Sequence, residues 1–156
     1  MAETKFDMFV SYSQFSVFAA GLERPFNDWE QEHVDQGFAW REESVAFATL
    51  EEAGTLHCEA LTADSWLSHP QTVRAIRVPF RVDGESIEIA SISDGVVFKL
   101  GAIGPCALVF ETWTGADGDM QARITFVPSM DEISPQILIA GALNPPAQLR
   151  MTARSA

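Results

Sequence analysis

The chain has 156 residues, of which 47% are hydrophobic and 21% charged, and its formal net charge is −12. This composition excludes intrinsic disorder, and the length fits one globular domain whose core needs neither a metal nor a disulfide. The negative charge argues against direct binding to nucleic-acid phosphates and favours a basic protein partner, or solubility alone.

Alternation of apolar and polar residues predicts that most of the chain forms strands. The inward positions, in chain order, are Phe6/Met8/Val10/Tyr12, Phe15/Val17, Val45/Phe47/Thr49, Leu56/Cys58/Ala60, Ile76/Val78/Phe80/Val82, Ile87/Ile89, Val96/Phe98/Leu100, Leu108/Phe110, Ala122/Ile124/Phe126 and Ile137–Ile139. Pro79 lies on the outward face of its strand and indicates an edge or a bulge. We therefore expect a mainly β fold.

Turn residues between these strands predict hairpins. Asp83-Gly84 and Asp94-Gly95 each separate two alternating runs, and residues 114–119 form a longer loop that contains two glycines. Successive hairpins are typical of an antiparallel meander, in a sandwich or a barrel-like closed sheet. The order of strand pairing cannot be inferred from these patterns, so both architectures stay open.

One segment favours a short helix, over residues 27–36. Asn27 is a capping residue with Glu30 three positions later, and Gly37 fits the left-handed position after a helix. This helix would place Asp28, Glu32 and Asp35 on one face. We expect residues 1–143 to form the single β-rich domain and residues 144–156 to form a loose C-terminal tail.

The sequence contains no strong catalytic or metal-binding motif. It lacks the serine elbow and both glycine-rich nucleotide-binding patterns, and Cys58 and Cys106 are best explained as buried, reduced thiols. His57 with Glu59 offers only two metal ligands, and Asp117 with Asp119 is better explained as a plain turn than as a calcium loop. We expect no catalytic residue, no metal and no cofactor.

The chain shows no signal for membranes or export. Its longest apolar run, over residues 137–143, is far shorter than the roughly 20 residues that a membrane helix needs. The first residues lack the basic region and apolar stretch of a secretory signal. We therefore expect a cytoplasmic protein without membrane insertion, and its oligomeric state stays open.

The acidic residues are unevenly distributed, because residues 1–64 hold 13 of the 22 acids but only 3 of the 10 bases. Aromatic side chains interleave with these acids. Acids attract a basic partner over long distances, and aromatic anchors supply short-range binding energy. The predicted partner-binding residues are Asp28, Trp29, Glu30, Glu32, Asp35, Trp40, Glu42 and Glu43. The alternative is that Trp29 and Trp40 only pin the helix and the following loop onto the sheet.

Several segments together resemble the competence protein J family. They are Ser11–Phe18, Asp28-Trp29, Gly37-Phe38, Val45–Phe47, Val78–Phe80, Glu88–Ile92, Val97–Leu100 and Glu111–Trp113, in similar order and spacing over residues 8–115. The resemblance implies a small, non-enzymatic inhibitor of a competence-associated nuclease that acts on incoming DNA. It agrees with the charge, since an acidic protein can occlude the basic groove of a nuclease as a surrogate for DNA.

Two other functions stay open at this point. A β-sandwich module that binds carbohydrate, lipid or calcium would use exposed Trp66 and Trp113 as stacking platforms and Asp117 and Asp119 as ligands. An enzyme with an unrecognised carboxylate pair is the third possibility, because such pairs meet only in three dimensions.

Overall fold

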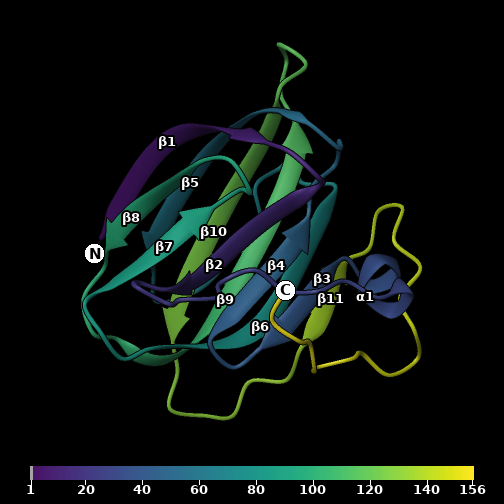
Figure 1. The fold of residues 1–156 in the computed structure, drawn as a ribbon. Coiled ribbons are helices and arrows are strands. Elements are labelled where there is room, and N and C mark those ends of the chain that lie inside the picture. Colours follow the sequence, from purple (N-terminus) through teal and green to yellow (C-terminus); the bar gives the residue numbers. More distant parts are fainter. Residues whose placement is uncertain (1) are drawn as a thin grey trace.

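Two β-sheets packed face to face form the fold (Figure 1). The computed structural model describes residues 2–156. One sheet has six strands in the order β1-β5-β10-β9-β6-β11, and the other has five in the order β3-β4-β2-β7-β8. The strands are β1 Glu3–Val10, β2 Gln14–Ala19, β3 Phe38–Arg41, β4 Ser44–Ala48, β5 Gly54–Thr62, β6 Arg74–Val82, β7 Ser86–Ala90, β8 Gly95–Lys99, β9 Gly104–Thr114, β10 Met120–Pro128 and β11 Gln136–Ile139. The predicted mainly β fold is confirmed, and the sheets form a sandwich and not a closed barrel.

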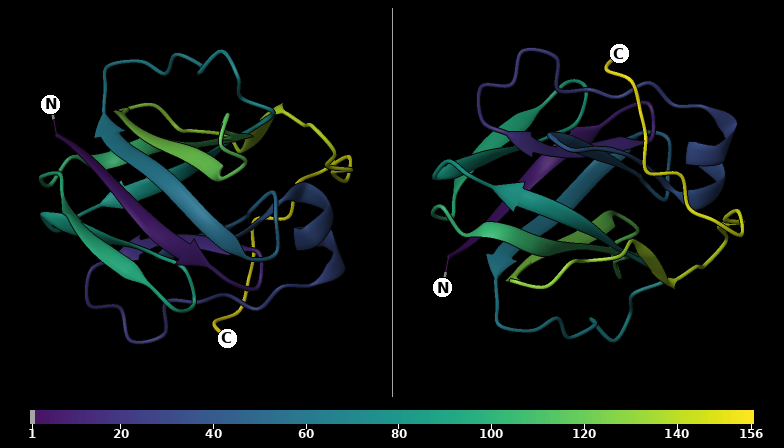
Figure 2. Two further views of the ribbon diagram at one scale, coloured as in Figure 1. Left: turned by 90° about the horizontal axis from the view of Figure 1, so that it is seen from above. Right: turned by 90° about the horizontal axis from the view of Figure 1, so that it is seen from below.

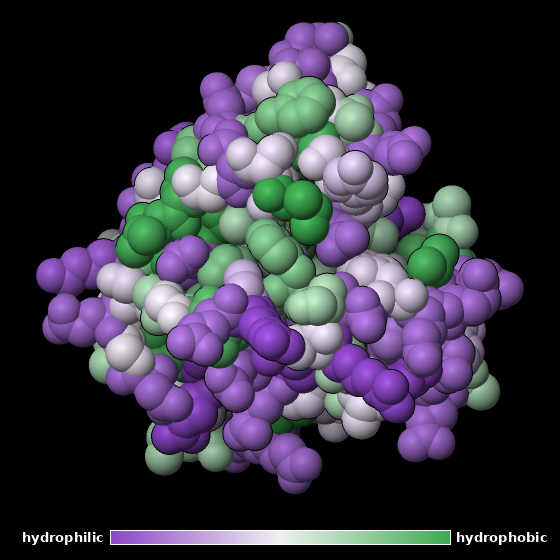
Figure 3. All heavy atoms as spheres, in the orientation of Figure 1, coloured by the Kyte–Doolittle hydropathy of each residue, from purple (hydrophilic) through white to green (hydrophobic). Residues whose placement is uncertain are grey.

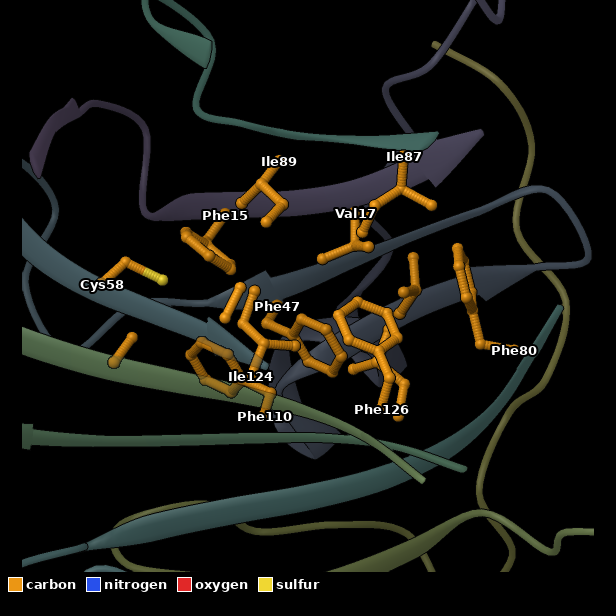
Figure 4. Close-up of a cluster of buried hydrophobic side chains, with 14 of the residues drawn as sticks. Phe15, Val17, Phe47, Cys58, Phe80, Ile87, Ile89, Phe110, Ile124 and Phe126 are labelled. Atoms are coloured by element: carbon orange, nitrogen blue, oxygen red, sulfur yellow. The ribbon is translucent and has the colours of Figure 1, made fainter. Parts of the chain in front are cut away.

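The core lies between the two sheets and consists largely of inward positions that alternation predicts (Figure 4). Phe47 of the five-stranded sheet stacks on Phe110 of the six-stranded sheet, with ring centroids 4.6 Å apart. Phe15 packs on the same ring at 5.6 Å. Burial of this aromatic and aliphatic surface is the main force that holds the two sheets together.

The predicted meander is wrong at one turn. Asp83-Gly84 joins β6 to β7, which lie in different sheets, so this turn is a corner of the sandwich and not a hairpin. The other two predicted turns do form hairpins, between β7 and β8 and between β9 and β10. Both β6 and β7 bury one face against the same core, so alternation looks the same whether the chain folds back in one sheet or crosses to the other.

Pro79 occupies a place where β6 has one free side. β11 pairs with β6 only over Ala75–Arg77, and β9 pairs with it along its whole length. Beyond Arg77, β6 is therefore an edge strand, where a residue without a backbone N–H is tolerated. The interpretation of Pro79 as an edge signal is correct for this half of the strand.

The helix is shorter than the sequence predicts. α1 spans Gln31–Gln36, and its N-cap is Glu30 and not Asn27. The Asn27 side chain is buried instead, where its amide N–H groups donate to the carbonyls of Ala39 and Ser44. Gly37 does take the predicted left-handed conformation, with φ +84°. None of the helices in residues 2–156 is long and apolar enough to cross a membrane.

Residues 144–156, for which the sequence predicts a loose tail, run alongside α1 (Figure 2). The N–H of Asn144 donates to the carbonyl of Asp35, and the N–H of Ala156 donates to the carbonyl of Phe26. An isolated bridge pairs Asn27 with Ser155. The C-terminal segment thus makes backbone contacts with the helix and with the chain that precedes it, although it has no periodicity of its own.

Candidate functional site

Five of the eight predicted binding residues gather around α1. These residues, called the α1 surface below, are Asp28, Trp29, Glu30, Glu32 and Asp35. The prediction that Asp28 shares a helix face with Glu32 and Asp35 is wrong, because Asp28 precedes the helix. Asp28, Glu30 and Glu32 are nonetheless exposed beside one another in the chain, so the acidic character of the surface remains.

A buried histidine fixes the start of the helix. The backbone N–H of Glu30 donates to Nδ1 of His33 at 2.9 Å, so Nδ1 is an unprotonated acceptor. Nε2 therefore carries the proton and donates to the carbonyl of Thr152 at 2.8 Å. The ring of Trp29 lies edge-on to this imidazole. His33 is only 1% exposed, and its ring ties α1 to the C-terminal segment.

Two carboxylates of the α1 surface are already paired within the chain. Nη1 of Arg150 contacts Oε2 of Glu30 and lies 3.5 Å from Oε1 of Glu32. Asp35 accepts a hydrogen bond from Nε2 of Gln31 at 2.8 Å. Such contacts between exposed groups contribute about 0–1 kcal/mol. A partner can therefore displace Arg150 at little cost.

The structure does not bring the other three predicted residues to the α1 surface. Glu42 and Glu43 are exposed in the β3–β4 turn, where they line a hollow with Arg81 at the far end of β3. Trp40 is partly buried, and its Nε1 donates to the carbonyl of Pro79 at 2.8 Å. Trp40 thus links β3 to β6 of the opposite sheet.

A small groove adjoins the α1 surface, and sequence reasoning missed it. The residues that line this groove, called the Tyr12 groove below, are Tyr12, Ser13, Gln14, Trp29, Val34 and Ala48. Tyr12 is predicted as an inward strand position, yet it lies beyond the end of β1, has φ +58° and is 70% exposed. The left-handed conformation of Tyr12 breaks the two-residue alternation of the strand. No local sequence pattern predicts this conformation for a tyrosine.

Hydrophilic residues predominate on the right of Figure 3, where Figure 1 places α1. The α1 surface contributes three exposed carboxylates, those of Asp28, Glu30 and Glu32. Tyr12 and Val34 are exposed near these carboxylates. Apolar anchors with polar residues around them are typical of protein interfaces.

A buried carboxylate organises the loop between β5 and β6. Glu111 accepts hydrogen bonds from the N–H of His69 at 2.8 Å, the hydroxyl of Thr72 at 2.7 Å, Nε1 of Trp66 at 2.8 Å and Nε of Arg123 at 3.1 Å. Burial alone would raise the pKa of Glu111. These four hydrogen bonds outweigh burial and lower the pKa below its ordinary value.

The tryptophans proposed as stacking platforms belong to this same loop anchor. Trp113 is 9% exposed and stacks on the ring of His69, with centroids 3.9 Å apart. Trp66 is partly buried, with its indole N–H on Glu111. The prediction that Trp66 and Trp113 are exposed is therefore wrong. His69 of the loop covers Trp113, and the hydrogen bond to Glu111 holds Trp66 against the sheet.

The hairpin tip between β9 and β10 meets His57 of β5. Nδ1 of His57 lies 2.7 Å from Oδ1 of Asp7, and Nε2 lies 2.9 Å from Oδ2 of Asp119 and 3.8 Å from Oδ2 of Asp117. His57, Asp117 and Asp119 each offer one ligand atom, and these three atoms lie within 4.8 Å of one another, which makes the cluster a candidate metal site. Hydrogen bonds to Asp7 and Asp119 raise the pKa of His57, and a charged imidazolium alone can satisfy these carboxylates.

The two cysteines are free and buried, as predicted. Burial raises the pKa of the Cys106 thiol to about 12 and that of Cys58 well above its ordinary value. Both groups are thus neutral thiols at physiological pH. Since only the thiolate is a good nucleophile, neither cysteine is suited to covalent catalysis.

Comparisons with known proteins extend the resemblance seen in the sequence. A model of the family "Competence protein J (ComJ)" matches residues 7–127. The crystal structure of ComJ from Bacillus subtilis, described as the inhibitor of the DNA degrading activity of NucA, is similar with a TM-score of 0.69 and 22% identity, over 81% of this chain and 96% of that chain. The structure named "Crocagin biosynthetic gene J" is similar with a TM-score of 0.54 and 13% identity, over 83% and 99% of the two chains. No curated protein matches. Because the family model covers most of its length, the chain belongs to the competence protein J (ComJ) family.

Proposed function

We propose that this protein inhibits a DNA-degrading nuclease by binding it directly, without catalysing a reaction of its own. Membership of the ComJ family supports this function, since the Bacillus subtilis ComJ of similar fold is described as an inhibitor of the DNA degrading activity of NucA. The observation that carries the proposal in this chain is the α1 surface. It presents three exposed carboxylates, Asp28, Glu30 and Glu32, next to an apolar groove.

The proposed mechanism is occlusion of a basic groove. A nuclease that tracks DNA needs cationic side chains that face phosphates. The α1 surface offers carboxylates to the same cations, so bound inhibitor and bound DNA exclude each other. The nuclease partner is therefore expected to be basic near its active site, and the complex is expected to form in the cytoplasm.

The test begins with the partner. The tagged protein is used to capture binders in its native host at low salt, and each protein eluted by rising salt is assayed for DNA degradation with and without added inhibitor. The proposal predicts a salt-eluted DNase whose activity falls as the protein is added. If no eluted fraction contains a DNase that the protein inhibits, the proposed function is wrong.

The location of the interface is tested with charge variants of the captured nuclease complex. The triple substitution Asp28→Asn, Glu32→Gln and Asp35→Asn should slow association at low salt by roughly tenfold and change dissociation little. The control is Glu42→Gln with Glu43→Gln, which removes two carboxylates at the other end of β3 and should slow association less. Equal association rates for the triple variant and the wild type would show that another surface binds the nuclease.

A further inference from the structure

We propose that the Tyr12 groove is the anchor point of the complex and that it receives an arginine side chain of the nuclease. This inference rests on the proposed function, because it names the contact that the inhibitor makes with a basic partner. It adds to the charge argument a specific pocket and a specific occupant.

The backbone holds Tyr12 outward at an energetic cost. Tyr12 and Ser13 both have φ +58°, a left-handed conformation that residues other than glycine seldom adopt. The loop after β4 keeps them there. The N–H of Ser13 donates to the carbonyl of Glu52 at 2.9 Å, and its own carbonyl accepts from the N–H of Thr49 at 3.0 Å. The ring of Tyr12 is therefore presented to solvent by a clamped turn, and strain held in this way is typical of binding sites.

The walls of the groove fit the stem and the plane of an arginine. Tyr12 and Trp29 supply aromatic surface, on which a guanidinium stacks through cation–π attraction. Val34, which is 53% exposed on α1, and Ala48 supply aliphatic surface for the methylene stem. The groove, of about 250 Å³, is small enough to take one long side chain.

Exposed carboxylates close to the groove in the chain favour a cation as its occupant. Two buried polar atoms of the groove residues, Oε1 of Gln14 and Nε1 of Trp29, lack a hydrogen-bond partner among the described residues. One is an acceptor and the other a donor, so they favour neither sign of charge in the occupant. Asp28 adjoins Trp29 in the chain, and the exposed Glu52 holds Ser13 through its backbone. Negative charge on residues that adjoin the groove disfavours an anionic occupant and favours a basic one over a purely apolar side chain.

Arginine is also the residue that a nuclease groove can supply. Its planar guanidinium is suited to phosphate oxygens, so arginines line surfaces that track DNA. An arginine held in the Tyr12 groove is withdrawn from phosphate. Lysine lacks the planar group that stacks between aromatic rings, which makes it the poorer occupant.

The experiment measures binding and inhibition with the captured nuclease. Tyr12→Ala should weaken binding by roughly 30-fold, as expected for an interface hot spot, mainly through faster dissociation. Tyr12→Phe keeps the ring and should stay within about threefold of the wild type. The control Leu67→Ala removes another exposed side chain, 83% exposed, that does not line the groove. It should leave affinity unchanged.

The occupant is identified by pairing Tyr12→Ala with single Arg→Ala substitutions in the nuclease. One arginine should show strong coupling, so that its loss costs little once Tyr12 is gone. If the wild type inhibits but Tyr12→Ala binds as tightly as Leu67→Ala, the groove is not the anchor. If Tyr12→Ala weakens binding and no arginine couples to it, the groove binds a side chain other than arginine. A wild type that fails to inhibit would overturn the proposed function itself, which separates the two conclusions.

Discussion

The side-chain amide of Gln36 exchanges two hydrogen bonds with the backbone of Arg150. Nε2 of Gln36 donates to the carbonyl of Arg150 at 2.9 Å, and the N–H of Arg150 donates to Oε1 of Gln36 at 2.8 Å. The amide thus imitates a neighbouring strand for one residue of the C-terminal segment. The side chain of the same Arg150 pairs with Glu30 and Glu32, so this contact also fixes the backbone of the residue that neutralises part of the α1 surface.

Removal of this amide should destabilise the fold. Gln36→Ala leaves the N–H and carbonyl of Arg150 without their partner, and we expect a loss of about 1–3 kcal/mol in the free energy of unfolding. Gln31→Ala is the matched control, because the Gln31 amide is exposed and, among residues 2–156, its hydrogen bond goes to Asp35. It should cost less than about 0.5 kcal/mol. Urea unfolding of the two variants checks this, and equal losses would contradict it.

Two glycines with the same backbone angle separate strain from packing. Gly37 and Gly21 both have φ +84°, but a Cβ at Gly37 would lie 2.9 Å from Leu143, whereas a Cβ at Gly21 meets nothing within 4 Å. Both alanine variants should lose about 1–2 kcal/mol from the left-handed backbone. Gly37→Ala should lose more, because Leu143 has to move. Thermal unfolding that shows the same loss for both would mean that Leu143 adapts freely.

Release of the paired carboxylates should speed association with the nuclease. Arg150→Gln frees Glu30 and Glu32, so we expect a rise of roughly a few-fold in the association rate at low salt. Arg81→Gln is the control, since it also removes one positive charge and frees one acid, Asp83, away from the α1 surface. The difference between the two variants should vanish at high salt. A slower association for Arg150→Gln would mean that Arg150 contacts the partner.

Glu111 should make the free energy of unfolding depend on pH in the acidic range. Its pKa is lower in the folded chain than the value of about 4.3 expected when unfolded. Glu111 therefore adds stability that is fully present above that unfolded value and is lost as the pH falls through the folded-state pKa. Glu111→Gln should be destabilised at pH 7, by about 2 kcal/mol, and should lose less on acidification to pH 3. Urea unfolding across this range checks the slopes, and parallel curves would contradict the assignment.

Local patterns predict the strands of this fold well, and they do not predict how the strands pair. Leu56, Cys58 and Ala60 alternate with outward residues, and all three are buried as expected. Yet β5 pairs with β10 in parallel, with Met120 opposite Leu56. Nothing near either strand in the sequence indicates this neighbour, because parallel pairing depends on how the whole chain crosses between the two sheets.

The candidate site is likewise predicted only in part by local sequence patterns. The acidic and aromatic segment around Asp28 and Trp29 is visible in the composition, but its geometry is not. Asn27 has a side chain that can cap a helix, but its amide is buried and donates to the carbonyls of Ala39 and Ser44 instead. Tyr12 joins the groove only because the loop after β4 clamps Ser13. Both outcomes depend on contacts between segments that are far apart in the sequence.

The most direct test of the account is an inhibition titration. The DNase captured by the protein from its host is held at fixed concentration, and the rate of plasmid degradation is measured as wild-type protein is added. The account predicts that degradation falls to the background rate near an equimolar ratio at low salt and that high salt weakens the inhibition. Plasmid degradation that continues at the full rate in a large excess of the protein would contradict it.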